Sequence, residues 1–96
     1  MTPPAVVLAS ADPTVIRGVG AAFEEEGVPL LVTAPAAARD AAIASPLAIG
    51  IAPCDAGLAI ALATGPDEPY VIGDDPRTVG RIAARLAARR PLGIAP

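Results

Sequence analysis

The chain has 96 residues, which is the length of one domain, and it carries a net charge of −3. Hydrophobic residues make up 53% of it, but 23 of them are alanine, so each removes little apolar surface from water on folding. We therefore expect a domain that is marginally stable alone and is helped by a partner. Histidine and lysine are absent, which excludes the commonest general base and all lysine-based covalent chemistry. The chain is not expected to be an enzyme by itself.

Charge is unevenly distributed along the chain. Residues 1–76 hold ten acidic residues and two arginines, whereas residues 77–96 hold five arginines and no acid. An acidic body with a basic end argues against nucleic-acid binding, which needs a broad basic face with aromatic side chains. No secretory signal is visible, and prolines and glycines interrupt the apolar stretch 41–63, so no membrane span is predicted. We expect a soluble intracellular protein whose single cysteine, Cys54, is a buried structural thiol.

Strand and helix patterns alternate through the first half of the chain. Apolar runs predict strands at 5–9, 29–33, 47–52, 58–63 and 70–72, with a turn at 53–57 that makes the third and fourth strands an antiparallel hairpin. Helical spacing, capping residues and prolines predict helices at 13–26, 36–45 and 76–89, with a loop at 65–69 and a helix stop at Pro91. This βαβαβββα order predicts an α/β fold. It is a compact three-layer domain over residues 1–96, with a mixed, mostly parallel sheet of about five strands and about three helices.

Three carboxylates, those of Glu24, Glu25 and Glu26, stand in the last turn of the first predicted helix, directly before Gly27. The helix dipole is negative at that end and disfavours acidic side chains. A divalent cation or a basic partner surface would offset the cost, and so would simple solvation of an exposed helix end. A single helix end cannot supply the six or so oxygens that Mg²⁺ or Ca²⁺ takes, so the other ligands of a metal here would come from elsewhere, such as another chain.

Four arginines recur at every fourth position of the last predicted helix: Arg77, Arg81, Arg85 and Arg89. This spacing places them on one stripe of the helix surface. The stripe fits a docking face for an acidic partner, and it also fits a solvated helix face in a chain that uses arginine in place of lysine.

The run 23–29, Phe-Glu-Glu-Glu-Gly-Val-Pro, resembles the glutamate-rich signature of the small subunit of the diol/glycerol dehydratase-reactivating factor. Three further segments are similar to that family in order and spacing, and they lie at 44–52, 58–62 and 80–86. The chain departs from the family pattern at Ile82, where the family has asparagine, and at Ala88, where a lysine is usual.

The resemblance implies a non-catalytic, chaperone-like subunit that works with a large ATPase subunit. Together they would release damaged cobalamin from adenosylcobalamin-dependent diol or glycerol dehydratase, with the small subunit acting by subunit exchange. ATP and cobalamin would be bound only through partners. Glu25, the middle glutamate, would reach a divalent cation, Mg²⁺ or Ca²⁺, at the interface with the large subunit. Partner contacts are expected at Glu24, Glu26, Arg81 and Arg85, and the implied location is the cytoplasm, with an association with a bacterial microcompartment allowed.

Two other functions fit the same residues. The chain could be a short relative of the dehydratase medium subunit that contacts cobalamin, although such a subunit should carry more chain than 96 residues for those contacts. It could also be an orphan interaction domain that binds an acidic partner through the arginine stripe.

Overall fold

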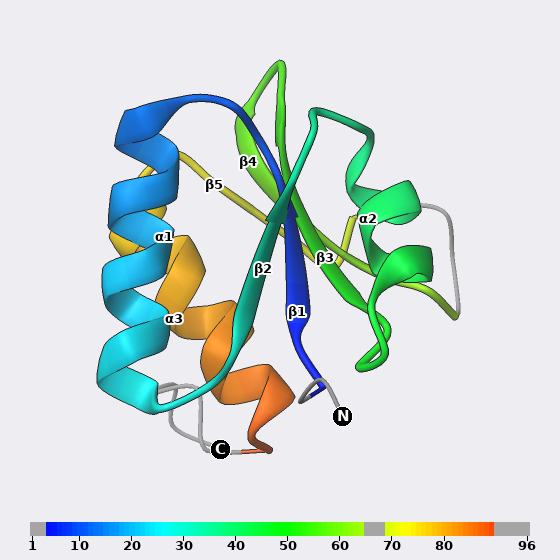
Figure 1. The fold of residues 1–96 in the computed structure, drawn as a ribbon. Helices are drawn as coiled ribbons and strands as arrows, with labels where there is room; N and C mark the ends of the chain where they lie inside the picture. The colour runs from blue at the N-terminus through cyan, green and yellow to red at the C-terminus, as the bar shows by residue number, and fades with distance from the viewer. Residues whose placement is uncertain (1–3, 65–68, 90–96) are drawn as a thin grey trace.

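A five-stranded sheet lies between two helical layers in the computed structural model, which describes residues 4–64 and 69–89 (Figure 1). Across the sheet the strands follow the order β2 (Leu30–Thr33), β1 (Val6–Ala9), β3 (Ile49–Cys54), β4 (Gly57–Leu62) and β5 (Val71–Gly73). β1 pairs in parallel with β2 and β3, while β4 pairs antiparallel with β3 and β5. The predicted mixed sheet and the antiparallel hairpin of β3 and β4 are confirmed.

The helices are divided between the two faces of this sheet. α1 (Pro13–Glu26) and α3 (Pro76–Ala87) pack together on one face, and α2 (Ala38–Ala44) covers the other (Figure 1). The chain moves from β1 to one edge strand, β2, and then returns past β1 to β3. Because crossover connections between parallel strands are right-handed, these two opposite moves put α1 and α2 on opposite faces. The three-layer prediction is confirmed.

β1 is buried on both faces and divides the core in two. Val6 and Leu8 point toward α1 and α3, where they join the large side chains of Val19, Phe23 and Val79. The alternate residues of β1 point toward α2 and join a cluster of smaller side chains, made by Val7, Ala9, Ala41 and Ala52. The two faces of one strand therefore meet cores of different composition.

Side-chain caps set where α1 and α3 begin. Asp12 accepts a hydrogen bond from the Thr14 backbone N–H at 2.9 Å, and Asp75 accepts one from the Thr78 backbone N–H at 3.2 Å. A proline follows each of these aspartates at the first helical position, where its missing N–H costs nothing. The predicted bounds of α1 are confirmed, whereas α2 and α3 are shorter than the predicted 36–45 and 76–89.

The predicted third strand, 47–52, is displaced by two residues because a turn precedes it. The Ser45 hydroxyl donates to the Ala5 carbonyl at 2.6 Å and accepts from the Leu47 N–H at 3.1 Å, and Ala48 is left-handed at φ 61°. β3 then continues through Pro53 and Cys54, so the turn predicted at 53–57 is shorter and consists of Asp55 and Ala56. Apolar composition alone could not separate this turn from the strand.

The buried position predicted for Cys54 is wrong, because its side chain is exposed at the end of β3. Residues 65–68 of the predicted loop and the predicted helix stop at Pro91 lie outside the described residues. Within the described part of the chain, no helix is long and apolar enough to cross a membrane.

Candidate functional site

The glutamate run ends α1 through a specific backbone motif. Gly27 is left-handed at φ 71°, and its N–H donates to the Glu24 carbonyl at 3.2 Å. The N–H of Val28 donates to the Phe23 carbonyl at 3.1 Å, and the Val28 side chain packs against the core cluster that contains Phe23. These two bonds and the apolar contact make a Schellman motif, which satisfies carbonyls that a helix end otherwise leaves free. Part of the run is therefore explained by helix termination.

The three glutamate side chains do not converge on one point. Glu25 forms an ion pair with Arg77 of α3, and the Glu26 Oε1 lies 3.3 Å from the Arg85 Nε. Glu24 instead lines a hollow on the β2 side of α1. The unfavourable helix-dipole position of two of the carboxylates is thus offset inside the chain, by arginines of the neighbouring helix. The two charge patterns of the sequence form one feature, which we call the charged seam: Glu25, Glu26, Arg77, Arg81 and Arg85.

Two glycines allow the helices of the charged seam to approach so closely. A Cβ added to Gly18 would lie 2.7 Å from the Pro76 Cβ, and one added to Gly80 would lie 2.9 Å from the Val19 Cα. Both distances are too short for real side chains, so each position needs glycine at the present helix separation. The backbone contact brings the glutamates of α1 within reach of the arginines of α3.

The two ion pairs of the charged seam differ in exposure. The side chains of Glu25 and Arg77 are 53% and 51% exposed, whereas those of Glu26 and Arg85 are 14% and 31% exposed. An ion pair open to solvent contributes only about 0.2–1 kcal/mol, because water and salt screen it. Glu26 is therefore held in the packing of the two helices, while Glu25 remains accessible to another molecule.

Arg81 is exposed and stands one helical turn from both Arg77 and Arg85. Its charge also contributes to lowering the pKa of Asp75, for which the hydrogen bond from the Thr78 hydroxyl is the main cause. Arg89, the last member of the predicted stripe, lies beyond the end of α3 with φ 57°. The stripe thus ends at Arg85 as a helical feature, and Arg81 is an exposed member in the middle of it.

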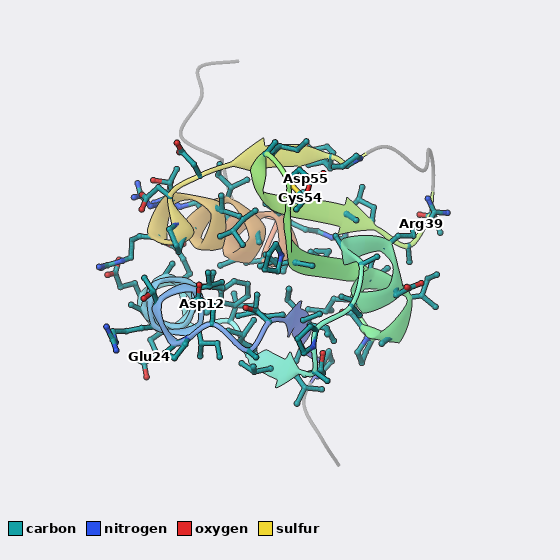
Figure 2. The ribbon with its side chains drawn as sticks, turned by 90° about the horizontal axis from the view of Figure 1, so that it is seen from above. Asp12, Glu24, Arg39, Cys54 and Asp55 are labelled. Carbon is teal, nitrogen blue, oxygen red and sulfur yellow. The ribbon has the colours of Figure 1, made fainter. Side chains whose placement is uncertain are left out.

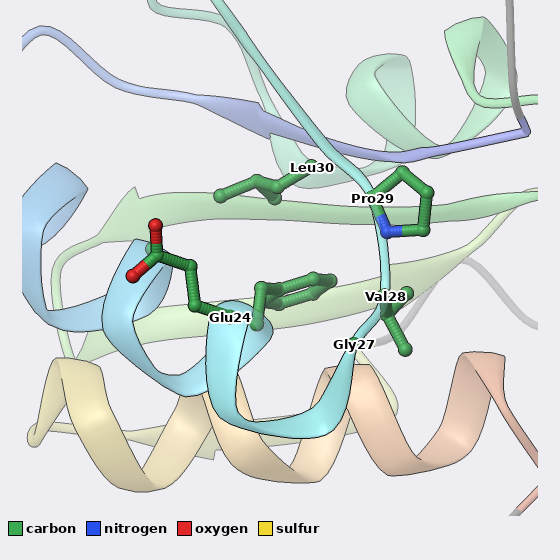
Figure 3. A pocket seen from close by; sticks show the side chains of 7 residues that line it. Glu24, Gly27, Val28, Pro29 and Leu30 are labelled. Carbon is green, nitrogen blue, oxygen red and sulfur yellow. The ribbon is translucent and has the colours of Figure 1, made fainter.

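Glu24 faces a shallow hollow of about 450 Å³ beside the charged seam (Figure 3). The hollow lies between the end of α1 and the start of β2, and Glu24 is the one charged residue that lines it. Its lining residues are Gly20, Phe23, Glu24, Gly27, Val28, Pro29 and Leu30. A partner that contacts this hollow would therefore meet apolar surface with a single carboxylate at its side.

Metal binding by this chain alone is not supported by the geometry of the described residues. Within residues 4–64 and 69–89, no group of three or more histidine, cysteine, aspartate or glutamate side chains could hold an ion. Glu25 can offer one hard carboxylate ligand, which suits Mg²⁺ or Ca²⁺, and the remaining ligands must come from another molecule.

Other polar residues lie far from the charged seam or have structural roles. Figure 2 shows Glu24 on the outer side of α1, with Arg39 beside α2 at the opposite end of the molecule and Cys54 on the β3–β4 hairpin. The buried Ser10 accepts a hydrogen bond from the Asp12 N–H at 3.1 Å, which supports the start of α1. The geometry and charge together define an α/β domain in which acidic groups of α1 pair with arginines of α3 where the two helices meet.

Comparison with known proteins identifies the family. No family model matches the chain, and no curated protein matches it. The solved structure of a glycerol dehydratase reactivase is similar, with 31% sequence identity, a TM-score of 0.79, and coverage of 96% of this chain and 98% of that chain. A diol dehydratase-reactivating factor solved with ADP and Mg²⁺ is similar at 30% identity and a TM-score of 0.78, over 97% of this chain and 100% of that chain.

The chain belongs to the family of small subunits of the diol/glycerol dehydratase-reactivating factors. The match runs over nearly the full length of both chains, so it covers the charged seam as well as the sheet. The sequence resemblance based on the run 23–29 is confirmed. Sequence analysis missed the pairing of Glu25 with Arg77 and of Glu26 with Arg85, although it identified both charge patterns separately.

Proposed function

We propose that this chain is the non-catalytic small subunit of a chaperone-like reactivating factor. With a large ATPase subunit, it helps to release damaged cobalamin from an adenosylcobalamin-dependent diol or glycerol dehydratase. It does so by subunit exchange, in which it docks on the dehydratase and opens a path for the damaged cofactor. ATP and cobalamin are bound by the partners and not by this chain.

The observation that carries the proposal is the end-to-end similarity to two reactivating-factor structures at 30–31% identity. The charged seam supports it, because its exposed ionic groups suit a partner that binds through complementary charges. We place the contact with the large subunit on this face, at Glu24, Glu25, Glu26, Arg81 and Arg85. Of these residues, Glu26 and Arg85 act mainly by holding α1 against α3, since they are the less exposed pair.

Glu25 is the residue of this chain that would hold a divalent cation at the subunit interface. It is half exposed, it carries a hard oxygen ligand, and it stands at the end of a helix where a cation is electrostatically favoured. A bound cation at this position would supply charge neutralisation between two protein surfaces. The diol dehydratase-reactivating factor of known structure was solved with Mg²⁺, which makes Mg²⁺ the first metal to test.

Co-purification tests the proposal as a whole. The chain is produced together with the large ATPase-like subunit of a reactivating factor, and the complex is then incubated with ATP, Mg²⁺, free coenzyme and a dehydratase inactivated by its substrate. We expect a stable complex and recovery of dehydratase activity that neither subunit produces alone. A chain that elutes by itself and restores no activity contradicts the proposal and favours an orphan interaction domain.

Glu25→Gln tests the metal role. We expect assembly with the large subunit to weaken about 10-fold or more, because a hard cation loses a charged oxygen ligand. Thermal stability of the isolated chain should change little, since the variant removes both a disfavoured helix-end charge and an exposed ion pair.

Asp40→Asn is the matched control for this variant. It removes the same charge from an exposed position on α2, on the opposite face of the sheet. Assembly should be unaffected by it. Equal binding by Glu25→Gln, Asp40→Asn and the parent chain in Mg²⁺ contradicts the metal role.

A further inference from the structure

The Glu25 carboxylate is already engaged in the isolated subunit, because the Arg77 guanidinium pairs with it across the charged seam. A guanidinium and a divalent cation both seek the same carboxylate oxygens, and each carries the positive charge that stabilises the ionised form. The two cannot share that oxygen without mutual repulsion. A cation at Glu25 therefore competes with Arg77 for the charge of this carboxylate, and most directly for the oxygen that Arg77 contacts.

Arg77 is suited to leave, unlike the other arginine that pairs with a glutamate of α1. Both members of the Glu25–Arg77 pair are half exposed, so breaking the contact costs little free energy. The Glu26–Arg85 pair is more buried, and its separation would leave charge poorly solvated between the helices. Replacement of an arginine by a cation is thus favoured at the Glu25–Arg77 pair over the Glu26–Arg85 pair.

The surface around Arg77 also offers room for the released side chain. A hollow of about 440 Å³ lies between α1 and the start of α3, and Arg77 lines it together with Arg17 and Asp75. The Asp75 carboxylate gives a displaced guanidinium a second anionic neighbour. Gly18 and Ala21, which have no side chain larger than a methyl group, also line this hollow.

We propose that Arg77 is an internal counter-ion that occupies Glu25 in the free subunit and is displaced when a divalent cation joins the subunits. This inference rests on the proposed function. It makes Arg77 a positioning residue: it holds the glutamate against α3, and it sets how much cation is needed before assembly occurs. Free subunits at low cation concentration would then stay apart.

Arg77→Gln tests the proposal in the complex of this chain with the large subunit, with MgCl₂ as the only divalent salt. The readout is the Mg²⁺ concentration at half-maximal assembly, followed by analytical gel filtration or fluorescence anisotropy. We expect that concentration to fall about two- to fivefold, which is the range corresponding to loss of an exposed ion pair. Arg17→Gln removes the same charge from an exposed residue that lines the same hollow, and it should leave the midpoint within about 1.5-fold of the parent, as expected for a distant screened charge.

Repeating the test in the Glu25→Gln variant distinguishes failure of this inference from failure of the proposed function. In Glu25→Gln the Arg77→Gln change should have no effect on assembly, because the shared carboxylate is gone. One outcome contradicts the counter-ion role of Arg77 but keeps the metal role of Glu25. In that outcome, Glu25→Gln abolishes Mg²⁺-dependent assembly, but Arg77→Gln shifts the Mg²⁺ midpoint no more than Arg17→Gln does. If assembly of the parent chain does not depend on Mg²⁺, both the counter-ion role of Arg77 and the metal role of Glu25 are contradicted. Circular dichroism of each variant confirms that the helices are retained.

Discussion

The two faces of the sheet are built in different ways. On the α1–α3 face, large side chains such as Phe23, Leu8 and Ile51 fill the core, and two helices approach through glycines and join at the charged seam. On the α2 face, a helix of seven residues lies on Val7, on alanines and on Gly50. The packing of the α1–α3 face therefore depends on large side chains that fill the core, whereas the packing of the α2 face depends on small residues that let helix and strand approach closely.

Coverage of the sheet also differs between the faces. Strand register places Leu31 beside Val7 and Ile72 beside Ala59, on the same side as α2. The short helix covers the middle of the sheet only, so Leu31 and Ile72 on its outer strands are 52% and 50% exposed. The α2 face thus presents apolar surface on the outer strands, whereas the α1–α3 face presents the paired ionic groups of the charged seam. The comparison predicts that mutations of equal size should act differently on the two faces.

Phe23→Ala should produce the largest loss of stability. Phe23 is 1% exposed and is the largest fully buried side chain of the described residues, and its removal leaves a cavity beneath α1. We expect the free energy of unfolding to fall by about 3–5 kcal/mol, which is enough to unfold a domain of marginal stability. Urea denaturation at 25 °C measures the loss. A fall below about 1 kcal/mol would show that the α1–α3 face does not depend on filled volume.

Gly50→Ala tests the opposite property on the α2 face. An added Cβ would lie 2.5 Å from the Ala38 carbonyl oxygen and 2.7 Å from the Ala41 carbonyl carbon, both of which are backbone atoms of α2. We expect a loss of about 3 kcal/mol, because helix and strand must separate. Chemical denaturation gives the value. A stability equal to that of the parent would mean that α2 does not rest closely on β3.

Gly80→Ala should have a smaller effect, on the helix contact of the charged seam. The added methyl group would meet the Val19 Cα at 2.9 Å and the Ala22 Cβ at 3.0 Å, so we expect a loss of about 1–2 kcal/mol despite the better helix propensity of alanine. Gly20→Ala is the matched control on α1, where no atom lies within 4 Å of the added Cβ. It should raise stability by about 0.5–1 kcal/mol. Opposite shifts of the melting temperature confirm the close contact, and equal shifts contradict it.

The smallest expected effect is a pH dependence at the start of α3. The Thr78 hydroxyl, which donates to the Asp75 carboxylate, lowers the pKa of that carboxyl below its ordinary value. The pKa of Asp75 is thus lower in the folded chain than in the unfolded chain. Its contribution to stability is therefore complete above the pKa of the unfolded chain, and it is lost as the pH falls through the pKa of the folded chain. Thr78→Val should therefore melt below the parent at pH 5–7, roughly a unit or more above the unfolded pKa, and the gap should close as the pH falls through the folded pKa. A gap that persists in acid contradicts the charge-assisted bond.

Local sequence signals predicted much of the fold for physical reasons that can be named. Asp12-Pro13 and Gly27 define both ends of α1 because caps and left-handed glycines act over a few residues only. The position of β3 was missed because Leu47 and Ala48 are as apolar as a strand, although Ser45 holds them in a turn through a hydrogen bond to Ala5, 40 positions away. A contact of that sequence separation leaves no local pattern.

The charged seam shows the same division between local and distant information. The glutamate run and the arginine stripe were each visible in the sequence. Their pairing required the knowledge that α1 and α3 share a face, and the strand order β2-β1-β3-β4-β5 cannot be derived from local patterns. The burial of Cys54 was mispredicted because it rested on the general tendency of a single cysteine to be a buried structural thiol, whereas the hairpin extends Cys54 beyond the part of β3 that pairs with β1.

Hydrogen–deuterium exchange of this chain, free and bound to the large ATPase-like subunit, tests the central claim most directly. The account predicts slower exchange in the complex at the end of α1, through Val28, and along α3, with α2 and β2 unchanged. Protection confined to α2 and to the strands that carry Leu31 and Ile72 would contradict the account, because the partner would then bind the apolar face and not the charged seam.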